Sequence, residues 1–192
     1  MKKIPTLFER VFDNHKVVDV TEKVTPGMEW VLKGEGTATL KIDGACCAII
    51  EGEFYKRYDC KKGKKPPEGF TPCCEPDEIT GHWPGWVKCD RENPDDKWFW
   101  GAYDYGAIDC LSPLQNGTYE AIGKHFNGNP YHKEYDVIIP HGREVIDVER
   151  TFKGIKKYLS ENYIEGIVFW KDGQPQCKIK RSDFGLSWGN KQ

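Results

Sequence analysis

Short apolar segments, separated by turn residues, recur along most of the 192-residue chain. Each is rich in β-branched or aromatic residues, or alternates apolar with polar positions, which is typical of strands. The predicted strands cover residues 36–50, 52–59, 118–123, 135–140, 164–170 and 176–181. Asp43-Gly44 is a turn signal inside the first segment, and Lys171-Asp172-Gly173 is a turn between the last two.

A helical period is found toward the C-terminal end of the sequence. Residues 147–162 carry apolar side chains three or four positions apart, and Asp147 is a suitable N-cap. The apolar positions at this spacing are Val148, Phe152, Ile155 and Leu159. Many strands and few helices predict an α+β fold with antiparallel sheets. With a mass of 22.1 kDa, we expect a single domain over residues 1–192.

Two segments depart from the strand pattern. Residues 61–97 contain six prolines and several glycines and predict a loop, although HWPGWVKCD within them indicates a short strand. Residues 98–105 are mostly aromatic.

Composition and charge exclude several classes of protein. Hydrophobic residues form 38% of the chain, which is enough for a core and excludes wholesale disorder. No apolar run approaches the roughly 18 residues of a membrane span, and the N-terminal MKKIPTLFERVFDNHK lacks the apolar stretch of a secretory signal. We therefore expect a cytoplasmic, intracellular protein with no membrane partner. A net charge of −2 excludes a uniformly basic protein but allows a local basic surface.

Eight cysteines are many for a chain of this length. Because no secretion signal accompanies them, we expect reduced thiols. The adjacent pair Cys46-Cys47 suits neither a strain-free disulfide nor the usual spacing of a zinc site. The sequence leaves open a loose zinc site built from Cys73, Cys74, His82 and Cys89.

The segment Lys41-Ile42-Asp43-Gly44 is the first candidate for chemistry. Residues two apart in a strand share a face, so Lys41 and Asp43 should point the same way. Taken alone, the segment also fits an ordinary hairpin.

A second group of charges lies in the last two predicted strands. Glu165 opens the apolar strand 164–170, where a carboxylate is costly unless a cation meets it. Lys178 and Lys180 flank Ile179, so two ammonium groups share one strand face. Together they predict a pocket suited to a metal-bound triphosphate, although a frayed strand end and a solvated edge strand would also explain them.

Two further charged residues belong to short motifs whose order along the chain is informative. Glu120 lies among apolar residues in Tyr119-Glu120-Ala121-Ile122-Gly123, and Arg57 lies in the segment YKRYD. The motifs K-x-D-G, R-x-D, Y-E-x-I-G, E-G-I-V-F and K-x-K follow one another across residues 41–180.

Because these five motifs occur in this order, the chain resembles the covalent nucleotidyltransferase superfamily, which contains ATP-dependent DNA and RNA ligases and mRNA capping guanylyltransferases. A narrower likeness covers about Lys41 to Trp188. The segments K-I-D-G-A-C-C, HWPGWV, IGKHFNGNPY, IPHG, IEGIVFW and GLSW resemble the small, single-domain, eukaryotic-type 5′–3′ RNA ligase with the K-x-D-G-x-C-C motif.

The resemblance implies a nucleotidyltransferase domain of antiparallel sheets flanked by helices, with no OB-fold domain. It also implies an ATP-dependent RNA ligase for RNA repair, which we expect to act as a monomer. In that reaction Lys41 attacks the α-phosphorus of ATP and forms lysyl-AMP. AMP then passes to an RNA 5′-phosphate, and a 3′-hydroxyl displaces it. Lys178 would face the α-phosphate, and Lys180 a phosphate further out.

The resemblance also implies roles for five binding residues. Glu165 would hold Mg²⁺ or Mn²⁺, and Glu120 the ribose. Asp43, beside Gly44 at the nucleotide, would orient the lysine or a ribose hydroxyl, and Arg57 would contact phosphate or the 3′-OH strand. Since a free lysine has a pKa near ~10.4, the nucleophile needs neighbouring cations and partial burial.

Some details differ from the superfamily or stay open. Cys46 stands where most ligases carry Arg or Ser, a change that the K-x-D-G-x-C-C group shares. For the contact with adenine, Ile139 and Phe126 are both candidates. The basic run formed by Lys56, Arg57, Lys61, Lys62, Lys64 and Lys65 indicates either an RNA surface or a solvated loop.

Four alternatives to an RNA ligase remain. They are a minimal DNA ligase, a guanylyltransferase that uses GTP, an RNA-binding module that kept the nucleotide pocket, and a zinc-dependent interaction protein.

Overall fold

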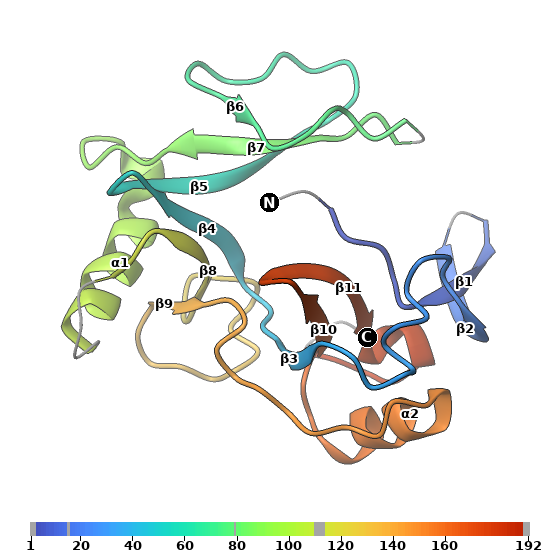
Figure 1. The fold of residues 1–192 in the computed structure, drawn as a ribbon. Coiled ribbons are helices and arrows are strands. Elements are labelled where there is room, and N and C mark those ends of the chain that lie inside the picture. The colour runs from blue at the N-terminus through green and yellow to red at the C-terminus, as the bar shows by residue number, and fades with distance from the viewer. Residues whose placement is uncertain (1–2, 15, 79, 110–113, 190–192) are drawn as a thin grey trace. The chain divides into compact units, whose positions relative to one another are not determined.

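The computed structural model describes residues 3–14, 16–78, 80–109 and 114–189. The chain forms two compact units, each with antiparallel strands and a helix (Figure 1). Unit 1 contains Met1–Lys3 and Asp43–His141, and unit 2 contains Ile4–Ile42 and Gly142–Gln192. The predicted α+β fold, with antiparallel sheets and few helices, is confirmed.

A six-stranded sheet forms the centre of unit 1, with the spatial order β6-β7-β5-β4-β8-β9 and antiparallel pairing throughout. Its elements are β4 (Ala45–Ile50), β5 (Glu53–Cys60), β6 (Thr71–Pro72), β7 (Trp83–Lys88), the 3-10 turn η1 (Pro94–Asp96), α1 (Lys97–Asp109), β8 (Gly117–Ile122) and β9 (Val137–Pro140). The strands predicted for this part of the chain are therefore confirmed, including the short one in HWPGWVKCD.

Helix α1 was not predicted from the sequence. It packs on one face of the unit 1 sheet, where its side chains Phe99, Trp100 and Tyr103 surround Phe54 with ring centroids 4.9–6.4 Å apart. Aromatic rings thus supply the buried area that leucines usually supply on a helix, so the usual apolar period is hidden.

Unit 2 contains a three-stranded sheet, with the order β11-β10-β3, and a separate hairpin of β1 and β2. Its elements are β1 (Phe8–Asp13), β2 (Lys16–Val24), β3 (Thr37–Lys41), α2 (Phe152–Glu161), β10 (Gly166–Lys171), β11 (Gln174–Lys180) and the 3-10 turn η2 (Arg181–Phe184). Residues 5–7 run alongside β11, where the Lys178 N–H donates to the Pro5 carbonyl and the Leu7 N–H donates to the Lys178 carbonyl. This outer edge of β11 is therefore paired at Lys178.

Helix α2 begins later than predicted. Thr151, and not Asp147, is its N-cap, with the hydroxyl accepting a hydrogen bond from the Gly154 N–H at 2.9 Å. Just before the predicted segment, the Ile146 N–H donates to the Ala38 carbonyl at 2.9 Å, so the chain runs beside β3 there. Residues 147–150 then form neither helix nor strand, and Val148 among them is buried in the unit 2 core.

The Asp43-Gly44 turn does not join a hairpin. Strand β3 pairs with β10, whereas β4 pairs with β5 and β8, so the chain changes sheets between Lys41 and Ala45. Because β3 ends at Lys41, the strand argument that placed Lys41 and Asp43 on one face does not apply.

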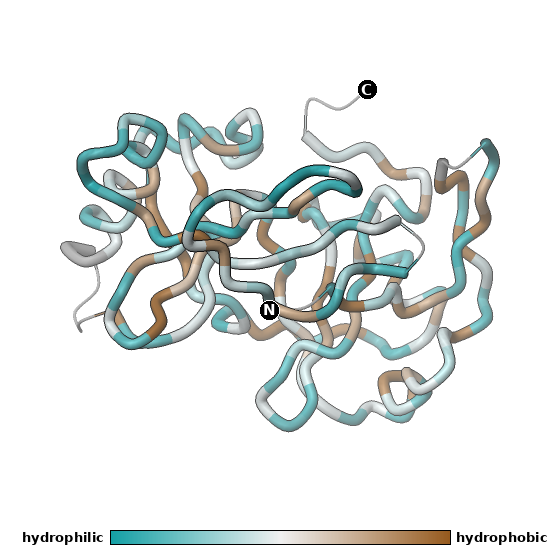
Figure 2. The backbone as a smooth tube through the Cα atoms, turned by 90° about the horizontal axis from the view of Figure 1, so that it is seen from above, coloured by the Kyte–Doolittle hydropathy of each residue, from teal (hydrophilic) through white to brown (hydrophobic). Residues whose placement is uncertain are grey.

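Each unit has its own hydrophobic core. Ile155, Ile167 and Phe169 are fully buried in unit 2, and Cys47 and Ala121 are fully buried in unit 1. Hydrophobic and hydrophilic positions alternate along much of the backbone (Figure 2). Among the described residues, no helix is long and apolar enough to cross a membrane.

Candidate functional site

The register of the unit 2 sheet places three lysines on one face. Gly166 lies opposite Lys41 on one side and Lys180 on the other, and Val168 lies opposite Lys178. The alternate positions, such as Ile179, point into the core. The prediction that Lys178 and Lys180 share a strand face is therefore confirmed, and Lys41 joins them.

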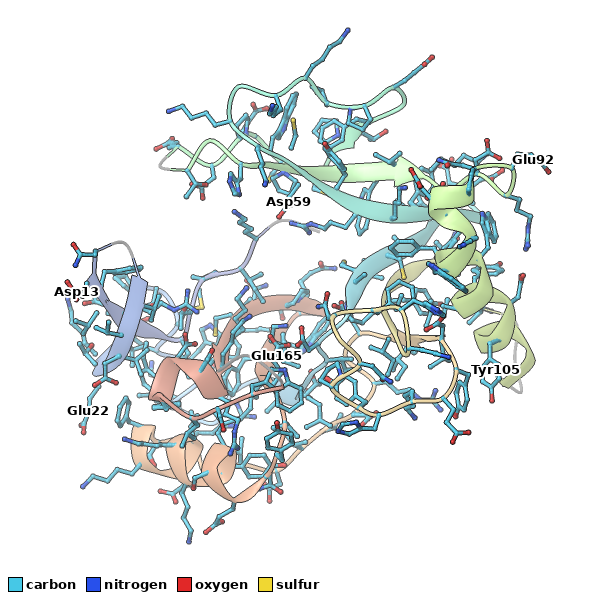
Figure 3. All side chains as sticks on the ribbon, turned by 180° about the vertical axis from the view of Figure 1, so that it is seen from behind. Asp13, Glu22, Asp59, Glu92, Tyr105 and Glu165 are labelled. Carbon is cyan, nitrogen blue, oxygen red and sulfur yellow. The ribbon has the colours of Figure 1, made fainter. Side chains whose placement is uncertain are left out.

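Glu165 meets two of these lysines. Its Oε2 accepts a hydrogen bond from Lys41 Nζ at 2.6 Å, and its Oε1 lies 2.8 Å from Lys180 Nζ. Glu165 is only 4% exposed, and Figure 3 shows it among surrounding side chains, unlike Asp13 and Glu22 on the β1–β2 hairpin. Both oxygens of a buried carboxylate thus carry an ammonium partner, as its predicted position required.

A glycine makes this arrangement possible. A Cβ atom at Gly166 would lie 2.2 Å from the Ile179 carbonyl oxygen and 2.9 Å from the Lys180 Cα. Any larger residue would push β10 away from β11, and with it the carboxylate of Glu165 from Lys180. Glu165 therefore depends on Gly166 for its contact with Lys180.

Lys178 has an unusual acidity. Burial, together with the positive charges of Lys41, Lys180 and Arg10, lowers the pKa of its ammonium group to about 8, while Glu165 acts in the opposite direction. Three cations and one carboxylate therefore leave this face with an excess of positive charge, which favours a bound anion.

The polar face of the unit 1 sheet carries a second group. Cys46 on β4 lies opposite Glu120 on β8, and the His141 N–H donates to the Thr118 carbonyl just beyond β9. Residues opposite each other, or two apart on one strand, share a face. These four side chains therefore lie on the face away from α1.

Glu120 is held by two donors. Its Oε1 accepts from the Gly44 N–H at 3.0 Å, and its Oε2 lies 2.8 Å from His141 Nε2. A Cβ at Gly44 would lie 2.2 Å from the Ala121 carbonyl oxygen, so only glycine lets this segment approach β8. The family resemblance implied that Glu120 and Gly44 both lie at the nucleotide, and in the structure the two residues are in direct contact.

Asp43 is fixed by the loop that follows β8. Its N–H donates to Tyr131 Oη at 2.7 Å, and its Oδ1 accepts from Asn127 Nδ2 at 3.0 Å. Asn127 Nδ2 also donates to the Gly44 carbonyl at 2.6 Å. Asn127 and Tyr131 belong to the segment IGKHFNGNPY, but sequence reasoning gave them no role.

Arg57 lies on the same face as Cys46. Lys56, which pairs with Cys47 in the register, forms an ion pair with Asp96 on the α1 side, so its neighbour Arg57 points the other way. Arg57 Nε lies 3.3 Å from Asp59 Oδ1. The four lysines of the loop after β5, namely Lys61, Lys62, Lys64 and Lys65, are exposed.

The two candidates for contact with adenine differ. Phe126 is buried in the unit 1 core, with its ring 5.2 Å from that of Phe99. Ile139 is half-buried and lies opposite Glu120 in the register. The register therefore favours Ile139.

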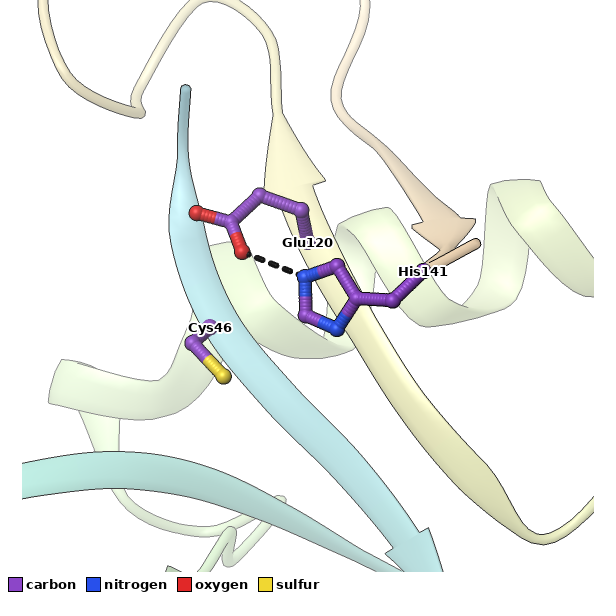
Figure 4. A group of neighbouring side chains, drawn as sticks. All are labelled: Cys46, Glu120 and His141. Atoms are coloured by element: carbon purple, nitrogen blue, oxygen red, sulfur yellow. Dashed lines mark hydrogen bonds and ion pairs between the residues drawn. The ribbon is translucent and has the colours of Figure 1, made fainter. Parts of the chain in front are cut away.

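The cysteines are arranged differently from the loose zinc site considered above. In the part of the chain that the structure describes, a single group of three or more possible metal ligands comes together, and it consists of Cys46, Glu120 and His141 (Figure 4). Burial, together with the charge of Glu120, raises the pKa of the Cys46 thiol to about 12, while the charge of Arg57 acts in the opposite direction. His141 lies in the segment IPHG, but no sequence signal assigned it a role.

The predicted site residues therefore fall into two groups. Lys41, Glu165, Lys178 and Lys180 meet in unit 2. Asp43, Gly44, Arg57 and Glu120 belong to unit 1, where Glu120 contacts Gly44.

Comparisons with known proteins support a single relationship. No protein-family model matches the chain. A Danio rerio protein named RNA ligase 1 is 33% identical over 243 residues, covering 89% of this chain and 74% of its own length. Proteins of the same name from Rattus norvegicus and Pongo abelii are 28% and 29% identical, and the alignments cover 68% and 51% of their lengths. The chain belongs to the RNA ligase 1 family.

Proposed function

We propose that this chain is an ATP-dependent RNA ligase that joins an RNA 5′-phosphate to a 3′-hydroxyl through lysyl-AMP on Lys41. The observation that carries the proposal is the Lys41–Glu165–Lys180 ion-pair group, with Lys178 on the same face. The relatives named RNA ligase 1 support it independently. In this proposal, residues 1–192 form one nucleotidyltransferase domain that acts as a monomer in RNA repair.

Lys41 is the proposed nucleophile. Its amine attacks the α-phosphorus of ATP, so that a P–N bond forms, the P–O bond to pyrophosphate breaks and the ammonium proton goes to solvent. In the resting structure Lys41 is paired with Glu165 at 2.6 Å. Lys41 must leave this partner before it can act as a neutral amine.

Lys178 and Lys180 are the proposed phosphate ligands. Lys180 is tied to Glu165, and its side chain is 33% exposed, so it can reach an incoming anion. Lys178 has a pKa lowered to about 8 by burial and by its cationic neighbours. A bound phosphate would supply the negative charge that this face lacks, and the gain would be largest where charge develops in the transition state.

Glu120, Gly44, Asp43 and Arg57 are the proposed contacts to the rest of the nucleotide. Glu120 is a buried carboxylate held by neutral or titratable donors, which suits a ribose hydroxyl. Ile139 lies opposite it and offers an apolar surface for adenine. Arg57, on the same face, would bind phosphate or the 3′-OH strand.

Glu165 is the proposed ligand for Mg²⁺ or Mn²⁺. A carboxylate oxygen suits a hard dication, but both oxygens of Glu165 now pair with lysines. The residue fits a metal only if one ammonium group is displaced from it. When bound, the metal would neutralise phosphate charge.

The experiment that tests the proposal is nucleotide labelling. The purified chain is mixed separately with α-labelled ATP and GTP, with Mg²⁺ present, and resolved by denaturing electrophoresis. We expect stable label from ATP alone, followed by sealing of nicked or single-stranded RNA but not of DNA.

Other outcomes would identify the alternatives. Label from GTP would indicate a capping guanylyltransferase, and sealing of DNA alone would indicate a DNA ligase. Absence of any label from a folded chain that still binds RNA would indicate a binding module.

A further inference from the structure

We propose that Cys46, Glu120 and His141 form a binding site for a zinc-class transition-metal ion. One possible ligand atom from each residue lies within 4.8 Å of the others, with Cys46 on β4, Glu120 on the neighbouring β8 and His141 directly after β9 (Figure 4). Thiolate, imidazole and carboxylate are the three ligand types that zinc takes from proteins. Three protein ligands with one open position are typical of zinc sites that keep a water or accept a substrate group.

The sheet register fixes these three side chains. Cys46 and Glu120 are direct cross-strand partners, and the His141 backbone is hydrogen-bonded to Thr118 at 3.0 Å. Two of the positions follow from paired strands and the third from a backbone hydrogen bond to the same sheet, so little ordering is required when a metal binds. Glu120 is buried and the other two residues are half-buried.

Each of two ligands has a partner that orients it. His141 Nδ1 lies 3.0 Å from Thr118 Oγ1, which turns Nε2 toward Glu120. Glu120 Oε1 accepts from the Gly44 N–H at 3.0 Å, which leaves Oε2 toward His141. Such outer hydrogen bonds are the usual companions of histidine and carboxylate metal ligands.

The hydroxyl of Thr118 also permits the change of tautomer that metal binding needs. With the ring proton on Nε2, the imidazole donates to Glu120 and Nδ1 accepts from Thr118. With a metal on Nε2, the proton moves to Nδ1, and the same hydroxyl oxygen accepts it.

The spacing needs only a small adjustment. Tetrahedral zinc with bonds of about 2.0–2.3 Å separates its ligand atoms by roughly 3.3–3.8 Å. His141 Nε2 and Glu120 Oε2 are now 2.8 Å apart, with a proton between them. The metal would replace that proton, the pair would open slightly, and the Cys46 thiol would lose its proton to solvent.

Charge and ligand type select the metal. One thiolate and one carboxylate neutralise a dication, so a buried, neutral complex results. Sulfur and nitrogen ligands favour zinc over magnesium. Glu165, which has two lysines as partners and no sulfur or imidazole, offers the opposite environment.

Occupation of this site would affect nucleotide binding, a consequence that rests on the proposed function. The carboxylate that would bind zinc is the one proposed to hold the ribose. Zinc should therefore compete with ATP and raise the concentration of ATP needed for adenylylation.

Cobalt(II) titration tests the site directly. Co²⁺ takes zinc positions and gives a thiolate-to-cobalt charge-transfer band that reports a Cys ligand. We expect this band in the reduced wild-type chain and in the control Cys74→Ser, which removes a half-buried thiol of the same unit outside the site. In Cys46→Ser the band should disappear, and in His141→Gln the affinity for Co²⁺ should fall about tenfold or more. Excess Zn²⁺ should abolish the wild-type band.

Each other outcome overturns the site. A wild-type chain without the band, or a band that persists unchanged in Cys46→Ser, excludes Cys46 as a ligand. Circular dichroism checks the fold of each variant. If Cys46→Ser does not fold, unchanged Co²⁺ affinity in His141→Gln decides against the proposal. Because this readout needs no catalysis, failure of the ligase proposal would appear separately, as the absence of nucleotide label.

Discussion

Glu165 and Glu120 are both buried carboxylates associated with the polar face of an antiparallel sheet, but their partners differ in charge. Glu165 meets two ammonium groups, from Lys41 and Lys180. Glu120 meets a backbone N–H and an imidazole, with a thiol opposite it in the register. The two carboxylates therefore differ in the charge around them, and the roles proposed for them follow from this difference: phosphate binding beside the ammonium groups, and a hydroxyl or a zinc-class metal beside the backbone N–H and the imidazole.

The largest expected effect is loss of the nucleophile on the unit 2 face. Lys41→Ala and Lys41→Arg should both reduce ATP labelling to background, because neither supplies a neutral amine at that position. The measurement is label that survives denaturing electrophoresis.

A pre-adenylylated RNA supplies the control for Lys41. It bypasses formation of lysyl-AMP, so Lys41→Ala should still seal it, at least weakly. Complete failure of a folded variant would mean that Lys41 also serves the final step, and persistent label in Lys41→Ala would remove its assignment as nucleophile.

The two carboxylates should differ when each is changed to the neutral amide. Glu165→Gln should lower the rate of adenylylation at least tenfold even at raised Mg²⁺, because Lys41 and Lys180 lose their shared counter-charge and the metal loses its ligand. Glu120→Gln is the matched variant in unit 1. It should mainly raise the ATP concentration at half-maximal rate, because it changes a hydroxyl contact. Normal labelling of Glu165→Gln would contradict its proposed role. Equal effects of the two variants on rate and on ATP requirement would show that the two carboxylates do not differ in function.

Burial of Lys178 has a cost in stability for the unit 2 face. Its pKa is about 8 in the folded chain and 10.5 for an ordinary lysine, so the folded state binds this proton more weakly. A shift of this size corresponds to about 3 kcal/mol. The cost is fully present below pH 8 and is removed as the pH rises from 8 toward 10.5.

Replacing this lysine should therefore raise stability while it lowers activity. At pH 7, Lys178→Met should increase the free energy of unfolding by about 1–3 kcal/mol, and the gain should shrink above pH 8. Urea unfolding of both chains at pH 7 and pH 9.5 measures it, with the exposed Lys153→Met as control. A gain that grows with pH would contradict the assigned direction.

The smallest effect on adenylylation is expected at the lysine loop of unit 1. Neutralising its four lysines should leave Lys41 labelling nearly unchanged, lower RNA sealing, and reduce the slope of log affinity against log salt by up to ~0.7 per lost phosphate contact. The neutralised residues are Lys61, Lys62, Lys64 and Lys65.

A charge-matched control keeps this last test specific. It neutralises four exposed lysines of unit 2, namely Lys33, Lys153, Lys156 and Lys157. If both quadruple variants change RNA affinity equally, or if the loop variant changes neither affinity nor slope, the loop is only a solvated surface.

The sequence by itself determined most strands from residue 36 onward, because their apolar and β-branched pattern is a local property, but it did not predict β1, β2 or β6. It placed Lys178 and Lys180 on one face, because residues two apart in a strand share a face, and the full burial of Ile179 between them agrees with this. It also identified Glu165 as a carboxylate in need of cations, because an apolar strand offers it no solvent.

Only the tertiary structure decided which strands are neighbours. The change of sheets after Lys41, the pairing of Ile146 with β3 and the position of His141 near Cys46 all depend on residues far apart in the chain. Spacing along the sequence carries no record of such contacts, because register is set by the packing of whole strands. Helix α1 depends on such contacts too, because its aromatic side chains are buried by packing around Phe54, which lies more than 40 residues earlier in the chain.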